Sequence, residues 1–496
     1  MVDLQESLDR LFTPKTVAVV GASNNMSKWG FIVLHNMLRT SFIGKIYPVN
    51  PVSKEILDLP AYKSLLDIPD KVDMAIVLVP AKIVPKVFEE CIDKGIQAVT
   101  VITAGFSEAG NIEEEKQLVK LARGKLRFVG PNGMGIASGN VRLNALMFPT
   151  NLSPGTFSFV SQSGNLGTIG MIVANERGVG INKFASSGNA ADLNISDYLE
   201  YFGKDPSTRS IGFYMEGLKP EEGRRFYELA KRISPYKPIV ILKSGVSEYG
   251  AKAAASHTAA MSGSDDIFNT VFKEAGIIRV NTLDEMFDFI ICYNRLPPFT
   301  GNNAGILTAG GGWGVLTADA CGKRGIELPR LPPEVIDQIN ELLPPYWAKS
   351  NPVDTVGTLD MVTPRILDIL LENKAFDAVM WLGGGLKAYF ADQGMNSKYI
   401  KDGEAKEQLK MIKELELQSM MDLLESIKRY NKPVFFTTIL GPSLTASVHL
   451  LEKELGFPVF YDPDRMTTCF KRLQSYYRYR KEKLGTLMLP IADSKN

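Results

Sequence analysis

Histidine, cysteine and net charge are all scarce in this chain of 496 residues. Its four cysteines lie far apart and form no Cys-x-x-Cys pair, a spacing that disfavours disulfides and zinc sites and favours buried, reduced thiols. Lysine plus arginine (56) nearly balances aspartate plus glutamate (55), so no overall field would recruit nucleic acid or an anionic membrane. Any anion-binding site must therefore be local.

Long hydrophobic runs are absent too, so we expect no membrane-spanning helix. The first six residues lack the basic and apolar regions of a secretion signal, and we therefore expect a cytoplasmic protein. A content of 45 % hydrophobic and 22 % charged residues is ordinary for a globular protein, and the length predicts about three domains.

Short apolar segments with the composition of β-strands alternate with helical segments along the chain. This alternation predicts an α/β fold of three consecutive Rossmann-like or flavodoxin-like domains, each a doubly wound parallel sheet. Linkers rich in proline and glycine place the domains at residues 1–148, 149–298 and 299–496, and a charged stretch, 392–408, is expected to form a surface excursion. The expected strands are 17–20, 45–49, 73–79, 98–103 and 127–129, then 157–160, 211–214 and 239–242, and finally 304–307, 378–382 and 434–437.

An internal repeat relates the second and third domains. The segment 159–167 aligns without gaps with 306–314, and the same offset places Arg177-Gly178 on Arg324-Gly325. Each copy puts a hydroxyl-plus-glycine turn between a strand and a helix, where free N–H groups and the positive helix end favour an anion. The alternative is that the small residues only let helix and strand approach closely. The two hydroxyls of Ser161 to Gly167 favour the anion site there, whereas both interpretations stay open for Thr308 to Gly314.

In the first domain, the strand that ends at Val20 enters the turn Gly21-Ala22-Ser23, the usual phosphate-facing position of a doubly wound sheet. The dinucleotide fingerprint fails there, because Ser23 and Met26 stand where it needs glycines. Asn50-Pro51 also replaces the acidic residue that binds an NAD ribose. A Rossmann-type oxidoreductase is therefore disfavoured.

Three lysines are expected at the carboxyl edge of the first sheet, namely Lys28, Lys45 and Lys54. They would suit a ligand with several phosphates. The alternative for each of them is a solvated surface charge.

One of the three histidines, His257, lies in a stretch of small residues, Ala253 to Thr258, between a strand and a helix that begins near Asp265. An imidazole on such a loop at a helix entrance is a good nucleophile for a phosphoryl group. The alternative is a polar side chain that only ties down its own loop, and the local sequence taken alone favours that alternative.

Short motifs along the chain occur in an order that resembles the α subunit of ADP-forming acyl-CoA (acetate–CoA) synthetases, relatives of succinyl-CoA synthetase. The resemblance runs from about residue 10 to about residue 470. Each motif alone is weak, but their ordered succession is specific. The motifs are Val20-Gly21-Ala22-Ser23, Tyr47-Pro48-Val49-Asn50-Pro51, Ala104-Gly105-Phe106-Ser107-Glu108, Gly130-Pro131-Asn132, Ser161-Gln162-Ser163-Gly164, Met215-Glu216-Gly217, Lys243-Ser244-Gly245, Ser256-His257-Thr258 and Asn351-Pro352-Val353-Asp354.

The resemblance implies that His257 carries a phosphoryl group between an acyl phosphate and a nucleotide. In the family, a glutamate at the position of Glu216 accepts the proton of one imidazole nitrogen, so that the other nitrogen attacks. Without the family, Glu216 would be taken as a rim carboxylate paired with a lysine such as Lys219. The phosphoryl group is expected to rest at a helix entrance formed by Ser161, Gln162, Ser163 and Gly164.

The resemblance also implies a site for coenzyme A in the first domain, with thioester chemistry near Asn132. Gly133 replaces a cysteine that is common in the family, and Ala309, Trp313 and Ala259 also depart from its pattern. These departures put acyl specificity and third-domain contacts in doubt, not phosphoryl transfer. The implied CoA-binding residues are Gly21, Ala22, Ser23, Asn25, Lys28, Asn50, Pro51, Lys54, Ile102, Thr103, Ala104 and Asn132.

A nucleotide site is missing from the sequence, since no Gly-x-x-x-x-Gly-Lys-Ser/Thr occurs and no fourth α/β region is left for an ATP-grasp fold. The resemblance therefore implies a separate ATP-grasp β subunit that binds Mg-ADP or Mg-ATP in an α2β2 assembly. The expected activity is an ADP-forming acid–CoA ligase of the acetate–CoA ligase type, acting on a small carboxylic acid and without a metal site in this chain. The alternative is a non-catalytic CoA-binding regulatory or scaffold protein, which would be expected to have lost His257 or Glu216.

Overall fold

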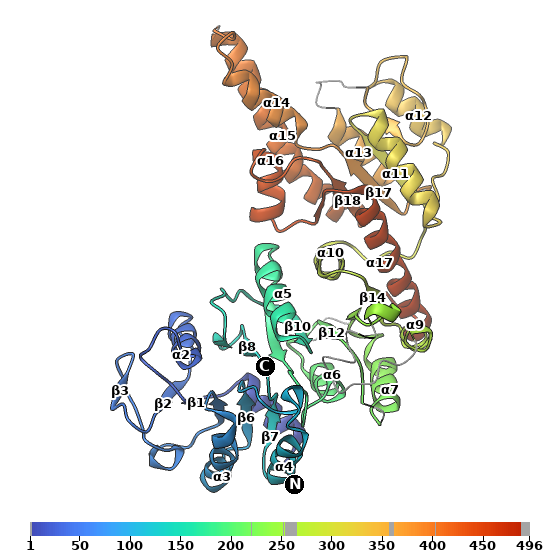
Figure 1. Ribbon diagram of the computed structural model, residues 1–496. Helices are drawn as coiled ribbons and strands as arrows, with labels where there is room; N and C mark the ends of the chain where they lie inside the picture. Colours follow the sequence, from blue (N-terminus) through green and yellow to red (C-terminus); the bar gives the residue numbers. More distant parts are fainter. Residues whose placement is uncertain are drawn as a thin grey trace. The chain divides into compact units, whose positions relative to one another are not determined.

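The computed structural model describes residues 2–219, 221–250, 252, 265–356, 362–401 and 403–487. The chain divides into two compact units, Met1–Met286 and Phe287–Asn496 (Figure 1). Two large sheets belong to the first unit and one to the second. No described helix is long and apolar enough to cross a membrane.

The first sheet is parallel throughout, with the strand order β2-β1-β5-β6-β7. Because the order reverses between β1 and β5, their carboxyl ends form the switch point at which doubly wound sheets bind ligands. Runs of buried valine, alanine and isoleucine fill these strands, which explains why the sequence pattern predicts them. The strands are β1 (Thr16–Val20), β2 (Lys45–Val49), β5 (Met74–Val77), β6 (Ala98–Val101) and β7 (Arg127–Val129), with a small hairpin of β3 (Glu55–Ile56) and β4 (Leu59–Pro60) and the helices α1 (Leu4–Phe12), α2 (Trp29–Arg39), α3 (Val84–Lys94) and α4 (Ile112–Ala122).

The parallel part of the second sheet, β11-β10-β12-β13-β14, has the same topology as the first sheet. An added antiparallel hairpin extends it, so the full order is β14-β13-β12-β10-β11-β8-β9. The hairpin, β8 (Gly135–Ser138) and β9 (Leu143–Leu146), pairs with β11 although it precedes the expected border at residue 148. The three domain ranges remain a prediction. The other elements are β10 (Pro154–Ser161), β11 (Ile181–Ser186), β12 (Ser210–Met215), β13 (Ile239–Lys243) and β14 (Ile278–Val280), with α5 (Gly164–Glu176), α6 (Ile195–Lys204), α7 (Gly223–Ile233), α9 (Asp265–Glu274) and α10 (Leu283–Arg295).

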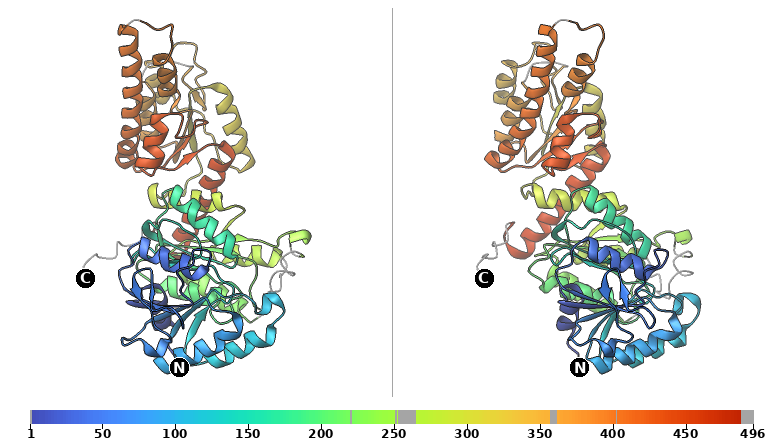
Figure 2. Two further views of the ribbon diagram at one scale, coloured as in Figure 1. Left: turned by 60° about the vertical axis from the view of Figure 1, so that its left-hand side comes forward. Right: turned by 90° about the vertical axis from the view of Figure 1, so that its left-hand side faces the viewer.

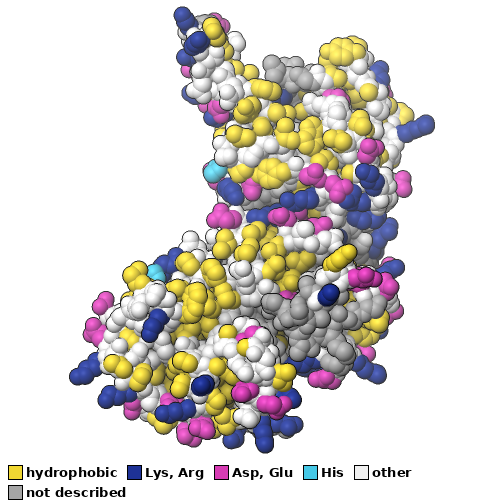
Figure 3. Space-filling model, in the orientation of Figure 1, with side chains coloured by type: hydrophobic (Ala, Val, Ile, Leu, Met, Phe, Trp, Pro, Cys, Tyr) yellow, Lys and Arg dark blue, Asp and Glu magenta, His cyan; other side chains and the backbone are white. Residues whose placement is uncertain are grey.

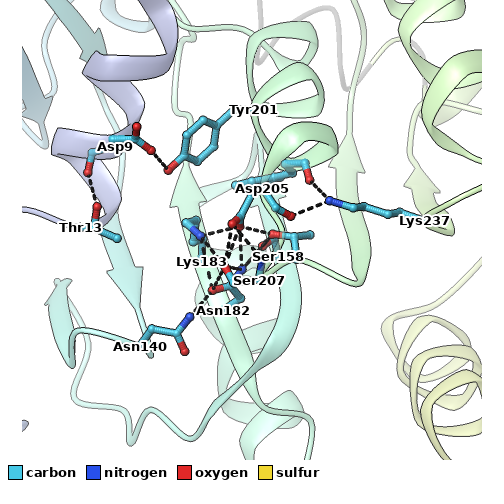
Figure 4. Close-up of polar contacts among 12 residues, drawn as sticks. Asp9, Thr13, Asn140, Ser158, Asn182, Lys183, Tyr201, Asp205, Ser207 and Lys237 are labelled. Carbon is cyan, nitrogen blue, oxygen red and sulfur yellow. Dashed lines mark hydrogen bonds and ion pairs between the residues drawn. The ribbon is translucent and has the colours of Figure 1, made fainter. Parts of the chain in front are cut away.

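A buried polar network anchors the amino end of β11 (Figure 4). Lys183 Nζ lies 2.5 Å from Asp205 Oδ2, and Asn182 Nδ2 donates to the same oxygen at 3.0 Å. Burial alone would raise the pKa of Asp205, but hydrogen bonds from Lys183, Thr208 and Ser207 outweigh it and lower the pKa to about 2. The network lies at the edge of the sheet opposite the carboxyl ends of the strands.

The third sheet, in the second unit, is parallel and has the order β16-β15-β17-β18-β19, again with its switch point beside the first strand along the chain. Helices α14 and α15 lie side by side (Figure 2), and the stretch 392–408, expected as an excursion, forms the adjoining ends of this pair. The elements are β15 (Ala304–Thr308), β16 (Val353–Asp354), β17 (Ala378–Leu382), β18 (Val434–Thr437) and β19 (Val459–Phe460), with α11 (Gly311–Lys323), α12 (Pro333–Asn340), α13 (Thr363–Glu372), α14 (Leu386–Met395), α15 (Gly403–Tyr430), α16 (Ala446–His449) and α17 (Pro463–Leu484).

The internal repeat is confirmed by the corresponding bounds of α5 and α11. Ser161 Oγ donates to the carbonyl oxygen of Ser163 at 2.5 Å, and Thr308 Oγ1 donates to that of Gly310 at 2.8 Å. The same hydroxyl therefore shapes the same strand-to-helix turn in both sheets. The doubly wound α/β fold expected from the sequence is likewise confirmed.

Candidate functional site

The turn after β10, residues 161–164, which we name the phosphate turn after its predicted role, leads into α5. Ser163 caps α5 by accepting a hydrogen bond from the backbone N–H of Leu166 at 3.4 Å. The other N–H groups of the first helical turn have no intrahelical partner, and the positive end of the helix dipole lies with them. Gly167 lets α5 approach the strand, since a Cβ there would lie 2.6 Å from the Cβ of Ser161. The role of Ser161, Gln162, Ser163 and Gly164 in holding phosphate remains a prediction.

Glu216 is held at this turn through both of its backbone groups. Gln162 Oε1 accepts the backbone N–H of Glu216 at 2.5 Å and that of Gly217 at 3.2 Å. On the other side, Lys243 Nζ donates to the carbonyl oxygen of Glu216 at 2.9 Å and also to that of Ser244. Burial lowers the pKa of Lys243. The phosphate turn, the end of β12 and the end of β13 are thus joined at one residue.

The Glu216 carboxylate is buried, with 7 % of the residue exposed, and its Oε2 accepts no hydrogen bond from the described part of the chain. Lys219 does not pair with it, because Lys219 Nζ donates to the carbonyl oxygens of Ala190 and Ala191 at 2.8 and 3.3 Å. The alternative of a rim carboxylate paired with Lys219 is therefore wrong. A buried acceptor without a partner is costly, and such groups call for a functional explanation.

His257 lies outside the described residues, as do all of residues 253–264. Its role as phosphoryl carrier stays a prediction. The segment that contains it follows β13, whose last residue, Lys243, contacts Glu216.

The glycine turn of the first sheet contacts both neighbouring strand ends. Gly21 has φ +95°, donates to the carbonyl oxygen of Val49 at 3.0 Å, and would place a Cβ 2.8 Å from the carbonyl oxygen of Leu78. Asn50 Nδ2 donates to the carbonyl oxygen of Ala22 at 2.9 Å. The structure therefore brings Gly21, Ala22 and Asn50 together at the switch point.

The remaining predicted CoA residues fall into three groups at the same edge. Ser23 Oγ accepts the backbone N–H of Asn25 at 3.0 Å, beside Lys28 at the start of α2. Pro51 and Lys54 follow β2 and are both exposed. After β6 come Ile102, Thr103 and Ala104, and the carbonyl oxygen of Thr103 accepts the backbone N–H of Asn132 at 2.9 Å. Their contribution to CoA binding remains a prediction.

The expectation that Lys45 lies at the carboxyl edge of the first sheet is wrong. Lys45 is the first residue of β2, at the amino edge, and its Nζ lies 3.1 Å from Asp70 Oδ2. A five-residue strand carries its two ends to opposite edges of the sheet, so only the residues after Val49 can reach the ligand edge. Figure 3 shows basic and acidic side chains interspersed on the visible face, in keeping with the balanced net charge.

The loop after β11, residues 186–191, is a part of the site that sequence reasoning missed. Ser187 donates its backbone N–H to the carbonyl oxygen of Ser161 at 2.9 Å, while Asn189 and Ala191 donate to those of Pro131 and Gly130 at 2.9 and 3.0 Å. The loop thus links the phosphate turn to the segment of Asn132. Its topological position could have revealed it, because β11 occupies in the second sheet the place that β2, followed by Asn50, occupies in the first.

The departure at Gly133 has a steric basis. A Cβ at this position would lie 2.7 Å from the carbonyl oxygen of Ser186, too close for any side chain without a backbone shift. The neighbouring Met134 lies over the phosphate turn, since a Cβ on Gly164 would be 2.3 Å from Met134 Cγ.

In the second unit, a cavity of about 100 Å³ lies at the carboxyl edge of the third sheet, between Thr308, Thr355 and Trp381. At its wall, the buried Glu416 accepts the backbone N–H groups of Gly385 at 3.1 Å and of Ala388 at 2.6 Å. An internal carboxylate therefore occupies the entrance of α14. Within the described residues, no group of three or more His, Cys, Asp or Glu side chains could hold a metal ion.

Three family models match the chain: a CoA binding domain over residues 15–139, a succinyl-CoA ligase like flavodoxin domain over residues 154–292, and a ligase-CoA domain over residues 304–371. Together with the three switch-point sheets, they define the class of CoA ligases. The alpha subunit of acetate–CoA ligase (ADP-forming) I from Pyrococcus furiosus is 37 % identical over 495 residues, which cover 96 % of this chain and 98 % of that one. The chain therefore belongs to the family of ADP-forming acetate–CoA ligase α subunits.

Two further proteins are similar to this chain. Acetate–CoA ligase (ADP-forming) from Methanocaldococcus jannaschii is 42 % identical over 345 residues, covering 69 % of this chain but 48 % of that longer one. A solved structure of dinucleotide forming acetyl-coenzyme A synthetase 1 from Ca. Korarchaeum cryptofilum, in complex with phosphate and ADP, superimposes with a TM-score of 0.84 at 34 % identity, covering 98 % of this chain and 100 % of that chain.

Proposed function

We propose that this chain is the α subunit of an acid–CoA ligase that interconverts acyl-CoA, ADP and phosphate with a small carboxylic acid, CoA and ATP. The acyl group passes from CoA to phosphate, and the acyl phosphate then gives its phosphoryl group to His257 and releases the acid. Phospho-His257 finally phosphorylates ADP. The observation that carries this proposal is Glu216, a buried carboxylate with both backbone groups clamped at the phosphate turn and one oxygen without a partner among the described residues.

Glu216 acts as the acceptor for one imidazole N–H of His257. Accepting that proton fixes the tautomer and leaves the other ring nitrogen free to attack phosphorus. The phosphoryl group then rests on the first turn of α5, where N–H donors and the helix dipole stabilise a dianion. The loss of Glu216 or His257 expected of a scaffold protein has not occurred.

Coenzyme A binds at the switch point of the first sheet, and its thiol end lies near Asn132. The hydrogen bonds from the 186–191 loop to Ser161 and to Pro131 support this arrangement, because they hold the Asn132 segment beside the phosphate turn. The thioester and the phosphate are thereby brought to one place.

A separate ATP-grasp β subunit binds Mg-ADP or Mg-ATP, and the assembly is α2β2. The family models that match this chain are CoA and ligase domains, and the Pyrococcus furiosus relative of almost equal length is named an alpha subunit. The chain spans about half of the Methanocaldococcus jannaschii relative, as expected if the same parts are fused there.

The test is phosphorylation of the chain by its β partner and MgATP. We expect an acid-labile label on the wild type and none on His257→Asn, whereas His35→Asn and His449→Asn, which change the other two histidines, keep the label. An acid-stable label, or an undiminished label on His257→Asn, would contradict the proposal.

A further inference from the structure

The side-chain amide of Asn189 has a fixed orientation. Its Nδ2 lies 2.5 Å from Glu108 Oε2, 2.7 Å from Glu115 Oε2 and 3.1 Å from Ser107 Oγ. Ionised carboxylates only accept hydrogen bonds, so the two glutamates require the NH2 group of the amide on their side. The carbonyl oxygen of the amide must then point the other way.

That oxygen meets Asn132. Asn132 Nδ2 donates to Asn189 Oδ1 at 3.2 Å, which fixes the second amide in turn. The backbone of Asn132 is also held, because its N–H donates to Thr103 and its φ is +60°. With Nδ2 committed to Asn189, Asn132 presents its Oδ1 away from the loop, and no described residue donates a hydrogen bond to it.

The carboxylate of Glu108, which accepts the NH2 group of Asn189, stays ionised. Glu108 Oε1 accepts the backbone N–H groups of Gly105 at 2.5 Å and of Phe106 at 3.2 Å. Partial burial would raise the pKa of Glu108, but the hydrogen bonds from Asn189 and these N–H groups outweigh it and lower the pKa. Glu108 is therefore an obligate acceptor at neutral pH.

We infer that Glu108, Glu115 and Asn189 are positioning residues that turn the amide oxygen of Asn132 toward the thiol of coenzyme A. The inference rests on the proposed function, which puts the thiol end at Asn132. The S–H of a thiol is a weak donor and its sulfur is a weak acceptor, so the direction of the thiol hydrogen is set by an oxygen and not by an NH2 group. Two glutamates that need not touch CoA thus set the direction in which the thiol hydrogen points.

The test reverses the amides without removing them. In Glu108→Gln/Glu115→Gln, the N–H groups of Gly105 and Phe106 retain the oxygen of the new residue 108, so its NH2 group faces Asn189. Both asparagine amides then flip, and Asn132 presents NH2 to the thiol. We expect kcat for formation of acyl-CoA from acyl phosphate and CoA, the direction in which the free thiol reacts, to fall about tenfold, the scale of one hydrogen bond. KM for CoA and labelling of His257 by MgATP should stay unchanged.

The matched control is Glu113→Gln/Glu114→Gln, two exposed positions on α4, the helix of Glu115, with the same change of charge. A second test uses Asn132→Asp, whose carboxylate offers an oxygen in either orientation. In Asn132→Asp the carboxylate faces Asn189 Oδ1, a second acceptor, and adding Glu108→Gln/Glu115→Gln turns the NH2 group of Asn189 toward it. The added changes should therefore not lower kcat further, a coupling that a merely structural role would not produce.

Unchanged kcat in the folded glutamine variant, or an equal loss with and without Asn132→Asp, would overturn the inference. If the double variant fails to fold, Asn189→Ala, which removes the acceptor of the Asn132 NH2 group, should show the same split between kcat and KM, and its absence there would overturn the inference as well. Failure of the wild type to label His257 would instead count against the proposed function.

Discussion

Gln162 and Glu216 are joined across two strands, since the side-chain oxygen of Gln162 lies 2.5 Å from the backbone nitrogen of Glu216. Gln162 belongs to the turn after β10, and Glu216 follows β12, which pairs with β10. The residue expected to stabilise the phosphoryl group and the residue expected to orient the histidine therefore share one rigid connection. Any change that loosens the turn also moves the carboxylate.

Replacing Glu216 with glutamine should slow phosphorylation of His257 by about 10- to 100-fold, the scale for an orienting partner of a histidine. The amide keeps the shape but is a weaker acceptor for the imidazole proton. CoA affinity, measured by calorimetry, should stay the same. Phosphorylation at the normal rate would remove Glu216 from the site, and a loss of CoA binding would mean that the two sites are wrongly placed.

Gln162→Leu should lower the same rate about tenfold while Glu216 itself is intact, because the clamp on its backbone N–H is lost. Rapid-quench labelling with MgATP and the β subunit measures this. Ile172→Ala, an exposed position further along α5, serves as the control and should label normally. Equal rates for the wild type and Gln162→Leu would show that the clamp does not position Glu216.

Gly133→Cys, which restores the residue common in the family, should destabilise this chain by about 1 to 3 kcal/mol, the usual cost of overpacking. The cause is the 2.7 Å approach of the new Cβ to the carbonyl oxygen of Ser186. Urea unfolding measures it, with Gly223→Ala as the control, since a Cβ there meets nothing within 4 Å. An unchanged urea midpoint for Gly133→Cys would show that the backbone around residue 133 shifts to accommodate the new Cβ.

Asp205→Asn should cost about 3 to 5 kcal/mol at pH 7, because it leaves the buried Lys183 without its partner. The pKa of Asp205 is lowered from 3.8 to about 2, so its contribution to stability is present above pH 3.8 and is lost as the pH falls toward 2. Urea unfolding at pH 7 and pH 3 should show a smaller acid-induced loss in Asp205→Asn than in the wild type. The exposed Asp93→Asn should match the wild type at both pH values.

The isolated chain should bind CoA but not MgATP, since it has the switch-point turn of the first sheet and no phosphate-binding loop of the Gly-x-x-x-x-Gly-Lys-Ser/Thr type. Calorimetry with each ligand tests this. Tight binding of MgATP to the isolated chain would contradict the assignment of the nucleotide to a β subunit.

The doubly wound sheets were predictable because their buried parallel strands are continuous apolar runs between turn residues. The hairpin β8–β9 was not predictable from the sequence. Its first strand, Gly135–Ser138, has few β-branched or aromatic residues, and its partner, β11, lies about 45 residues further along the chain. The prediction for Lys45 was wrong because this residue begins β2, and the two ends of a strand lie at opposite edges of the sheet.

Within the candidate site, the resemblance predicts Glu216, but the contacts that hold it come from Gln162 and Lys243 and required the fold. Asn189 was missed for the same reason. Its partners Glu108 and Glu115 lie in the turn before helix α4 and in that helix, and nothing in the local sequence links a polar loop to carboxylates so far away along the chain.

The hairpin β8–β9 limits how the first domain could be exchanged for that of another protein. Its strands extend the second sheet, yet they follow directly on the Asn132 segment of the first. Recombination that exchanged residues 1–148 for those of another protein would also replace two strands of the neighbouring sheet and their pairing with β11. A cut at residue 148 would therefore leave the second sheet without β8 and β9, and any first domain joined there would have to supply a hairpin that pairs with β11.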